Sequence, residues 1–503
     1  MSVRYRAGMR GRDDSRRARP TAHELARYEA LFASRTRGMK SSAMREMMAL
    51  TERPDVISLA GGLPDTSTFE PELYAKLMAK VAASSTARAL QYGPTEGLAA
   101  TVDCIVEVMA REGTTVDPAE VIVTTGGQQV IDLVCKTLID PGDVIVAEAP
   151  TYPGAVPTFS AYQADVEQIE IDADGMPIDA LEATLDRLHA QGRRPKFIYT
   201  IPNFQNPGGV TMSLARRRRL IEIARERELL VLEDNPYGLL RYEGEALPTL
   251  HALDAQADGS PPTHGGASDL VIYAGTFSKI LSPGLRLGWA VAPQPVLAKL
   301  NLGKQGSDLC SSPVTQLFVA EYFAERTAEG GPEWLAYVER LRDLYRARRD
   351  TMLEALAEHF GGGASWTQPQ GGLFIWATLD ERIDTTDLLA LAQGSERVAF
   401  VPGRAAYVDG RSGSYSMRLN FAGSSEQDIR EGIRRIGRAM RTQLGLLGSL
   451  TGTPGRAPSA EAEEPTPTLA ELEPAAGSDA RLADVVALPR REDEPSARRL
   501  ADR

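Results

Sequence analysis

Tyr273-Ala-Gly-Thr-Phe-Ser-Lys-Ile-Leu-Ser-Pro-Gly-Leu-Arg-Leu-Gly-Trp289 is the stretch around which the chain is organised. It begins as an apolar strand, passes through a loop of small residues that carries Lys279, and resumes as a second apolar run at Leu287. A lysine between buried strands is unusual, because burying an ammonium ion costs free energy unless the ion is paired or used. The stretch therefore allows a reactive role for Lys279. The alternative is a surface turn on which Arg286 pairs with a carboxylate.

A lysine in an apolar setting can lose its proton and attack a carbonyl group. The aldehyde of pyridoxal phosphate is such a carbonyl. Ser278 and Arg286 would then face the phosphate as a hydroxyl donor and a fixed cation. The stretch alone leaves both interpretations open, so its context along the chain decides between them.

Length and composition exclude several classes of protein. The 503 residues suffice for two or three domains, and 43% hydrophobic with 25% charged residues is ordinary for a globular protein. The net charge of -12 argues against general affinity for nucleic acid or anionic membranes. The three cysteines and five histidines are scattered, so we expect no disulfide framework and no metal site. No apolar run approaches the length of a membrane span, and a cytoplasmic protein is expected.

Short apolar strands alternate with helical segments through the middle of the chain. The strands start near Val121, Val144, Lys196, Leu229 and Leu270. This alternation predicts an α/β fold, with a mostly parallel sheet and helices on both of its faces. Glycines and polar residues gather after the strands, where open parallel sheets place their ligand sites.

Several of these loops suit a ligand. Gly62 follows a short strand and allows close backbone approach, and Gly127 and Gln128 start a helix whose free N–H groups would suit a phosphate. Tyr152 and Asp234 come at strand ends. Each feature alone also fits a simple turn or ordinary packing.

The C-terminal half predicts a smaller α+β unit. Strands are expected at 371–378, 397–401 and 415–422, and helices at 325–359 and 424–446. A further helical pattern runs from Tyr28 to Leu50. The Arg-rich residues 1–27 and the Pro-, Ala-, Glu- and Ser-rich residues 449–503 are predicted to be disordered tails.

Four motifs together resemble the fold-type I aminotransferases that use pyridoxal phosphate. They are Ser58-Leu-Ala-Gly-Gly-Leu-Pro64, Tyr92-Gly-Pro-Thr-Glu-Gly97, Asn203-Phe-Gln-Asn-Pro-Gly208 and the segment from Gly275 to Arg286. The resemblance extends from about residue 32 to residue 446 and is strongest to the 2-aminoadipate and kynurenine aminotransferase group. It implies a large domain with a mostly parallel seven-stranded sheet flanked by helices, plus a smaller α+β domain. We place the large cofactor-binding domain at 79–318, with 28–78 and 319–448 forming the arm and the small domain.

The resemblance also implies roles for individual residues. Lys279 would bind the cofactor covalently and later act as the base, and Asp234 would pair with the pyridine nitrogen. Tyr237 and Asn206 would contact the ring hydroxyl, and Tyr152 would stack on the ring. The phosphate would be bound by Gly127, Gln128, Ser278 and Arg286. Gly127 stands where many relatives have a hydroxyl residue, so one phosphate contact is in doubt.

Substrate and subunit contacts are implied in the same way. Arg418 would bind the α-carboxylate of the substrate, with Asn206 and the backbone of Gly62 in support. Tyr92 would reach the phosphate of a neighbouring subunit, which implies a homodimer with shared sites. Arg45 either reads an acidic substrate side chain or pairs with Glu46 on a helix surface, and both interpretations stay open.

The expected activity is ping-pong transfer of an amino group from an L-amino acid to a 2-oxo acid such as 2-oxoglutarate. The donor would be of the 2-aminoadipate, aromatic or branched-chain type. One alternative is a lyase or decarboxylase of the same fold, because the cofactor supplies the electron sink for all three reactions. A second alternative is a transcription regulator with a non-catalytic cofactor domain. It is disfavoured because only about thirty residues precede the resembling region.

Overall fold

The structure, a computed structural model, describes residue 28 and residues 31–39, 55–256 and 268–451. Arg45 lies outside these described residues, as do most of the expected helix from Tyr28 to Leu50 and nearly all of the two predicted tails. Within that expected helix, the described segment Ser34–Gly38 forms a short 3-10 helix (η2).

Seven strands form the largest sheet, in the spatial order β2-β8-β7-β6-β5-β3-β4. Their bounds are β2 Val121–Thr124, β3 Val144–Ala149, β4 Asp165–Glu170, β5 Phe197–Thr200, β6 Leu230–Asp234, β7 Val271–Thr276 and β8 Gly288–Val291. Neighbouring strands are parallel except at β8, which runs antiparallel to β2 and β7. The predicted mostly parallel sheet is confirmed, and the C-terminal ends of β5, β6 and β7 meet at one edge.

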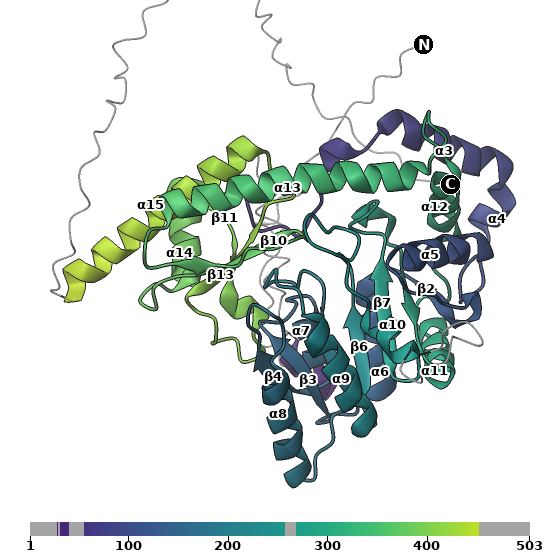
Figure 1. The fold of residues 1–503 in the computed structure, drawn as a ribbon, viewed down its shortest axis with the longest axis horizontal. Coiled ribbons are helices and arrows are strands. Elements are labelled where there is room, and N and C mark those ends of the chain that lie inside the picture. The colour runs from purple at the N-terminus through teal and green to yellow at the C-terminus, as the bar shows by residue number, and fades with distance from the viewer. Residues whose placement is uncertain (1–27, 29–30, 40–54, 257–267, 452–503) are drawn as a thin grey trace, which may run out of the picture. The chain divides into compact units, whose positions relative to one another are not determined.

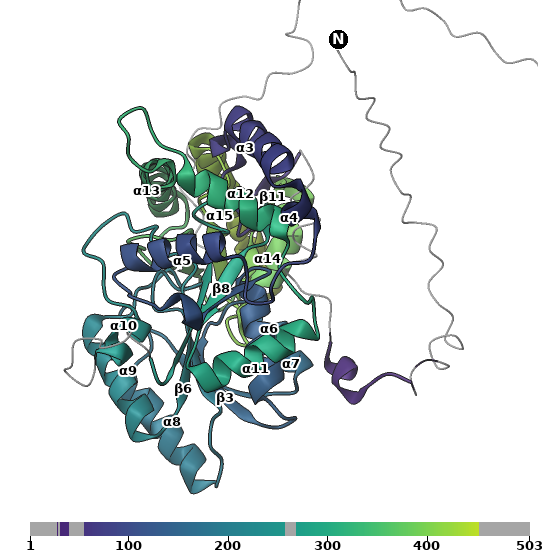
Figure 2. The same ribbon diagram turned by 90° about the vertical axis from the view of Figure 1, so that its right-hand side faces the viewer.

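Alternate side chains of the strands pack into two different helical layers. In β3, Ile145 and Ala147 pack with α6, α7 and α11, whereas Val144 and Val146 pack with α8, α9 and α10. Figure 2 shows these two groups of helices on opposite sides of the sheet. Their bounds are α6 Gly127–Leu138, α7 Ala155–Ala161, α8 Ile178–Ala190, α9 Leu214–Glu226, α10 Leu250–Ala255 and α11 Gln294–Gln305. Continuous apolar strands are the expected consequence of burial on both faces.

Four more α-helices lie among the described residues before 325. They are α3 Pro71–Ser84, α4 Thr86–Leu90, α5 Ala99–Arg111 and α12 Pro313–Ala324. The apolar face of α5 packs on Val121, Val123 and Trp289 of the sheet. Helix α5 therefore covers the sheet beside β2 and β8.

A second, antiparallel sheet has the order β12-β13-β10-β9. Its strands are β9 Ser365–Trp366, β10 Phe374–Thr378, β12 Val401–Pro402 and β13 Ser416–Asn420. The short strands β1 Ile57–Ser58 and β11 Val398–Ala399 pair in parallel beside it as a separate two-stranded sheet. The register of β10 and β13 sets Trp376 directly opposite Arg418. All three strand segments expected in this half of the chain are present.

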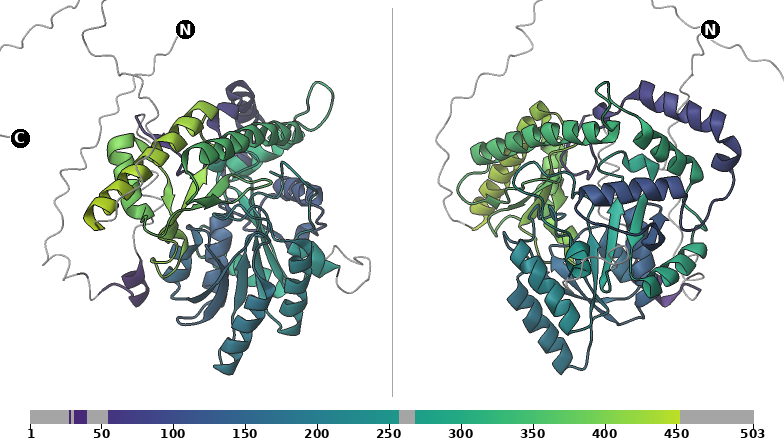
Figure 3. Two further views of the ribbon diagram at one scale, coloured as in Figure 1. Left: turned by 60° about the vertical axis from the view of Figure 1, so that its left-hand side comes forward. Right: turned by 45° about the vertical axis from the view of Figure 1, so that its right-hand side comes forward.

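Two long helices pack along each other over this second sheet. They are α13 Glu333–His359 and α15 Glu426–Thr451, and α14 Thr385–Leu391 lies nearby (Figure 1). Figure 3 shows the yellow α15 running beside the green α13 in both views. The expected helix start at Glu325 is wrong, because Gly330 at φ +85° and Pro332 hold residues 325–332 in a loop. The domain boundaries at 78, 318 and 448 remain predictions.

Candidate active site

Lys279 lies in the loop that follows β7 at the edge where the parallel strands end. Gly275 in β7 allows the ring of Trp289 on β8 to pack against the backbone, since a Cβ there would lie 2.2 Å from that ring. After Thr276 the chain leaves the sheet, and Nζ of Lys279 donates a 2.5 Å hydrogen bond to the carbonyl oxygen of Gly62. The side chain of Lys279 therefore points into a cavity, and the alternative that Lys279 lies on a surface turn is wrong.

The surroundings of Lys279 favour its neutral amine. Burial, together with the positive charges of Arg418 and Arg286, lowers the pKa of Lys279 to about 8. Desolvation and like charges both disfavour an ammonium ion. A primary amine with this pKa can act as a nucleophile and as a proton acceptor near neutral pH.

Asp234 is the last residue of β6 and lies on the same edge of the sheet. Burial raises the pKa of this carboxyl group to about 6, and the hydroxyl of Tyr199 on β5 opposes that rise by donating a 2.7 Å hydrogen bond to Oδ2. A cation close to Asp234 would restore its ionised form. A protonated ring nitrogen is one such cation.

Asn206 connects two groups that lie far apart in the sequence. Its Oδ1 accepts a 3.0 Å hydrogen bond from Nη1 of Arg418, and its Nδ2 donates a 3.3 Å hydrogen bond to the hydroxyl oxygen of Tyr237. The loop that carries Asn206 is anchored below the site by Glu148, which accepts from the backbone N–H of Ile201 at 3.1 Å. Hydrogen bonds therefore link the phenol of Tyr237, the amide of Asn206 and the guanidinium group of Arg418 in that order.

Arg418 is fully buried on β13. Its Nη2 donates a 2.8 Å hydrogen bond to the carbonyl oxygen of Ala60, and its Cζ lies 4.3 Å from the centre of the Phe374 ring. Burial lowers the pKa of Arg418 to about 10, so the guanidinium group remains charged at neutral pH. A buried guanidinium group held in this way can bind a carboxylate through two parallel N–H groups.

The opposite end of the cavity is suited to an anion. Helix α6 starts at Gly127, after Gly126 at φ +81°, and its first N–H groups have no partner within the helix. The guanidinium group of Arg286 lies against Gly126, where an added Cβ would be 2.6 Å from Nη2. The hydroxyl oxygens of Ser278 and Thr276 lie 2.8 Å apart beside them. Donors and a cation therefore converge on one point.

The side chain of Gln128 has a different orientation from the one expected of a phosphate ligand. Its Nε2 donates to the carbonyl oxygen of Gly154 at 3.1 Å and to Oγ1 of Thr158 at 2.8 Å, both on or next to α7. Only the backbone N–H of Gln128 is left for an anion. Gly127 likewise offers a backbone N–H without a side-chain hydroxyl.

Most of the predicted site residues surround one cavity of about 280 Å³. The predicted residues that line it are Gly62, Gly127, Gln128, Tyr152, Asn206, Asp234, Tyr237, Ser278, Lys279, Arg286 and Arg418. Tyr92 does not line it and is 78% exposed, while Arg45 lies outside the described residues.

Sequence reasoning missed three residues of this site. Tyr199 contacts Asp234, Phe374 packs under Arg418, and Thr276 contacts Ser278. Tyr199 and Thr276 each lie at the C-terminal end of a predicted strand, which is the signal that could have found them. Phe374 carries no such signal, because its strand belongs to the other sheet.

The residues present fit pyridoxal phosphate. The anion-binding end matches its phosphate, Asp234 its ring nitrogen, and Tyr237 with Asn206 its ring hydroxyl, while the amine of Lys279 matches its aldehyde. Among the described residues no cluster of three or more His, Cys, Asp or Glu side chains could hold a metal ion.

Comparison with known proteins identifies the family. The sequence model described as "Aminotransferase class I and II" matches residues 54–436. The chain belongs to this family. It is 42% identical over 421 residues to aromatic-amino-acid aminotransferase 1 of Thermococcus litoralis, covering 83% of this chain and 95% of that protein. It is 39% identical over 410 residues to 2-aminoadipate transaminase of Thermus thermophilus, covering 81% and 96%.

Solved structures agree with this assignment. The crystal structure of Pyrococcus horikoshii kynurenine aminotransferase in complex with PMP has a TM-score of 0.75 and 38% identity, and covers 84% of this chain and 99% of that one. This aminotransferase is therefore a pyridoxal-phosphate-dependent transaminase of fold type I, acting on amino acids and oxo acids. No helix in the part of the chain that the structure describes has the length and apolar character to cross a membrane.

Proposed function

We propose that this aminotransferase moves the amino group of an L-amino acid to 2-oxoglutarate or a similar 2-oxo acid by a ping-pong mechanism. The observation that carries the proposal is the arrangement of Arg418 and Lys279 around one cavity. A guanidinium group that fixes an α-carboxylate also fixes the position of the Cα beside it. The amine of Lys279 lines the same cavity and would act on the Cα–H bond of a substrate held in this way.

The roles of the chain's own residues follow from their contacts. Nζ of Lys279 would bind the cofactor covalently and, once released by substrate, carry the proton from the substrate Cα. Asp234, kept in place by Tyr199, would hold a proton on the ring nitrogen, and Tyr237 with Asn206 would orient the ring hydroxyl. Pyridoxal phosphate supplies the ring that takes up the electron pair left on Cα. Tyr152 would cover one ring face and exclude water.

The donor class is proposed from the resemblance and the relatives. Two relatives are named for aromatic amino acids and 2-aminoadipate, and a third is described with kynurenine as its substrate. We therefore propose a donor of the 2-aminoadipate, aromatic or branched-chain type. Arg45 is proposed to read an acidic side chain when one is present.

We also propose that the enzyme is a cytoplasmic homodimer with shared active sites. Tyr92 is 78% exposed in the single chain, and so is most of Leu90, two residues before it. Leu302 on α11 and Leu309 just after α11 also expose apolar side chains. The loop after Tyr92 is tied to α11 by a hydrogen bond from Asn301 to Glu96. Exposed apolar side chains on neighbouring segments are typical of a protein interface.

Near-visible absorbance of the purified holoenzyme tests the proposed reaction. Addition of L-2-aminoadipate, L-kynurenine, L-phenylalanine or L-leucine without any acceptor should bleach the cofactor band, and 2-oxoglutarate should restore it. The ranking of the donors identifies the substrate class. Release of ammonia and a 2-oxo acid without an acceptor would instead establish a lyase and overturn the proposal.

A further inference from the structure

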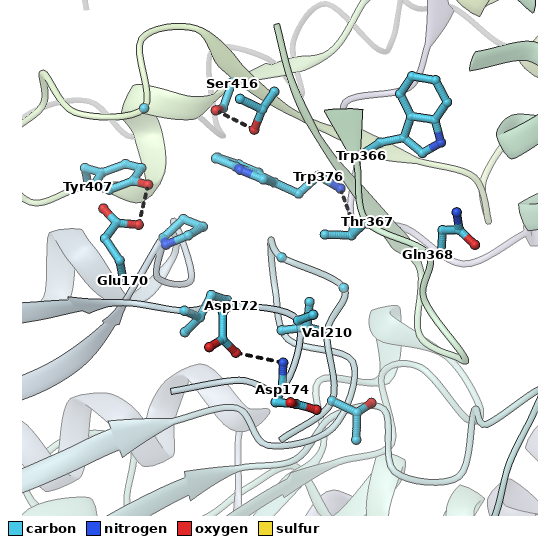
Figure 4. A pocket seen from close by; sticks show the side chains of 18 of the residues that line it. Glu170, Asp172, Asp174, Val210, Trp366, Thr367, Gln368, Trp376, Tyr407 and Ser416 are labelled. Carbon is cyan, nitrogen blue, oxygen red and sulfur yellow. Dashed lines mark hydrogen bonds between the residues drawn. The ribbon is translucent and has the colours of Figure 1, made fainter. Parts of the chain in front are cut away.

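A second cavity, larger than the first, lies between the two sheets. It has a volume of about 1010 Å³ and is formed by the end of β4, the loop after Asn206, strands β9 and β10, and the segment 407–416 (Figure 4). Neither Lys279 nor Asp234 lines it. Cavities of this size accommodate small organic ligands.

The side chains on one face of the β10–β13 pair extend from the active site to the second cavity. Trp376 on β10 lies opposite Arg418 on β13, and the next pair on the same face is Thr378 with Ser416, whose hydroxyl oxygens are 3.1 Å apart. Arg418 lines the first cavity, whereas Trp376 and the Thr378–Ser416 pair line the second. Gly208 and Gly209, which follow Asn206, form another part of its wall.

The charged side chains that line the second cavity are all acidic. Glu170, Asp172 and Asp174 line it, and no Lys, Arg or His does so among the described residues. Asp172 is neutralised by a bidentate ion pair with Arg216. Glu170 accepts a 3.2 Å hydrogen bond from the hydroxyl of Tyr407, and neither it nor Asp174 forms an ion pair with any basic residue that the structure describes. Two carboxylates are thus left for a cationic ligand.

Aromatic rings line the same space. Trp366, Trp376, Tyr407 and Tyr415 all contribute to the wall, and Figure 4 shows the indole of Trp376 extending toward the Tyr407–Glu170 pair. The faces of such rings attract organic cations. Trp376 is only 9% exposed, yet its indole N–H donates to no acceptor in the described part of the chain. Because Trp376 lines the cavity, an oxygen atom of a ligand bound there can accept a hydrogen bond from this N–H group.

We propose that the second cavity binds a small organic ammonium ion that carries an acceptor oxygen, of the amino-alcohol class. Glu170 and Asp174 face its charge, the rings of Trp376 and Tyr407 cover its apolar part, and the indole N–H of Trp376 donates to its oxygen. The loop of residues 205–209 separates this ligand from the active site.

Choline is a suitable probe, because 3,3-dimethyl-1-butanol has the same shape and hydroxyl group without the charge. Titration of the full-length holoenzyme is followed by calorimetry and by tryptophan fluorescence. Choline should bind saturably and at least about tenfold more tightly than the neutral alcohol. Excess 2-oxoglutarate should not displace it. Equal binding of the two compounds, absence of saturable choline binding, or displacement by 2-oxoglutarate would each overturn the proposal.

Variants distinguish the contributions of charge and of the indole. Glu170→Gln combined with Asp174→Asn should weaken choline binding by about tenfold, and Trp376→Phe should weaken it by about threefold while keeping the aromatic face. Glu72→Gln on α3, an exposed site outside the cavity, makes a charge change of the same kind and should leave the affinity unchanged. If the cavity variants fold and transaminate normally but bind choline as the wild type does, the assignment is wrong.

Discussion

The hydroxyl of Tyr199 donates a 2.7 Å hydrogen bond to Oδ2 of Asp234, across the adjacent strands β5 and β6. Both residues lie at the C-terminal end of their strands, so the parallel register brings them together. A buried carboxyl group of this kind needs a donor to remain ionised. We therefore propose that Tyr199 is a positioning residue that acts through Asp234.

Substitution of Tyr199 by Phe should weaken cofactor binding. Without the hydroxyl, the pKa of Asp234 rises further above its present value of about 6. A smaller fraction of Asp234 is then ionised, so the carboxylate stabilises a protonated ring nitrogen less. A hydrogen bond to a charged group contributes about 1.5–3 kcal/mol, so the affinity of the apoenzyme for pyridoxal phosphate should fall at least about tenfold. The acid limb of the kcat/KM profile should also move to higher pH. Tyr162→Phe, which removes a hydrogen bond to Asp132, is the control and should change neither.

Cofactor capture by the apoenzyme should depend on the protonation of Lys279. Because its pKa is lowered to about 8, the neutral amine predominates above that pH, and the rate of covalent capture should rise with pH with its midpoint at about 8. Stopped-flow absorbance of apoenzyme mixed with pyridoxal phosphate measures this rate. Arg418→Gln removes a positive charge and should move the midpoint upward. A wild-type midpoint near the ordinary lysine value of about 10.4 would contradict the proposed environment.

Arg418→Lys should impair every substrate that has an α-carboxylate. The ammonium group retains the charge but loses the bidentate geometry and the contact with Asn206. Loss of a buried, hydrogen-bonded charge contact costs about 2–5 kcal/mol, so kcat/KM should fall by at least about thirtyfold for amino acids and oxo acids alike. Arg411→Gln, on an exposed loop near the same sheet, should have no such effect. A selective loss for one half-reaction would argue against the role.

Arg45→Ala tests the choice of side chain. If Arg45 pairs with an acidic substrate, KM for L-2-aminoadipate and for L-glutamate should rise about tenfold or more, while KM for L-leucine changes little. Steady-state kinetics with the three donors makes the comparison within one variant. A parallel rise for leucine would place Arg45 in the helix-surface pairing with Glu46 instead.

A mixing experiment tests whether Tyr92 acts in a partner subunit. Lys279→Ala and Tyr92→Ala should each have low activity as homodimers. Hybrid dimers contain one site with an intact Lys279 and an intact Tyr92, so refolding the two variants together should restore activity. Activity that stays at the average of the two separate variants would exclude shared sites.

The sequence by itself determined the central sheet, its helices and the identity of the chemical groups. Continuous apolar strands such as β3 and β7 must be buried on both faces of a sheet, whatever their position in it. The polar residues of the site then fall in the loops that follow the strands. Asp234 ends such a run and Lys279 lies in the loop after another, whereas Tyr237 is assigned only through the family resemblance. Local pattern also placed the end of α13 at His359 and the start of α15 near Glu426. It missed the loop before Glu333, because the charged residues 325–329 continue a helical pattern that Gly330 and Pro332 end.

Only the tertiary structure decided the contacts between distant segments. The hydrogen bond of Arg418 to Asn206 joins residues 212 positions apart, and the pairing of Arg418 with Trp376 depends on the register of two strands in the second sheet. A shift of that register by one residue would turn one of the two side chains to the opposite face. The orientation of Gln128 toward α7, the bond between Tyr199 and Asp234, and the acidic second cavity have the same origin. Each depends on how separately folded elements pack, and no short stretch of sequence contains that information.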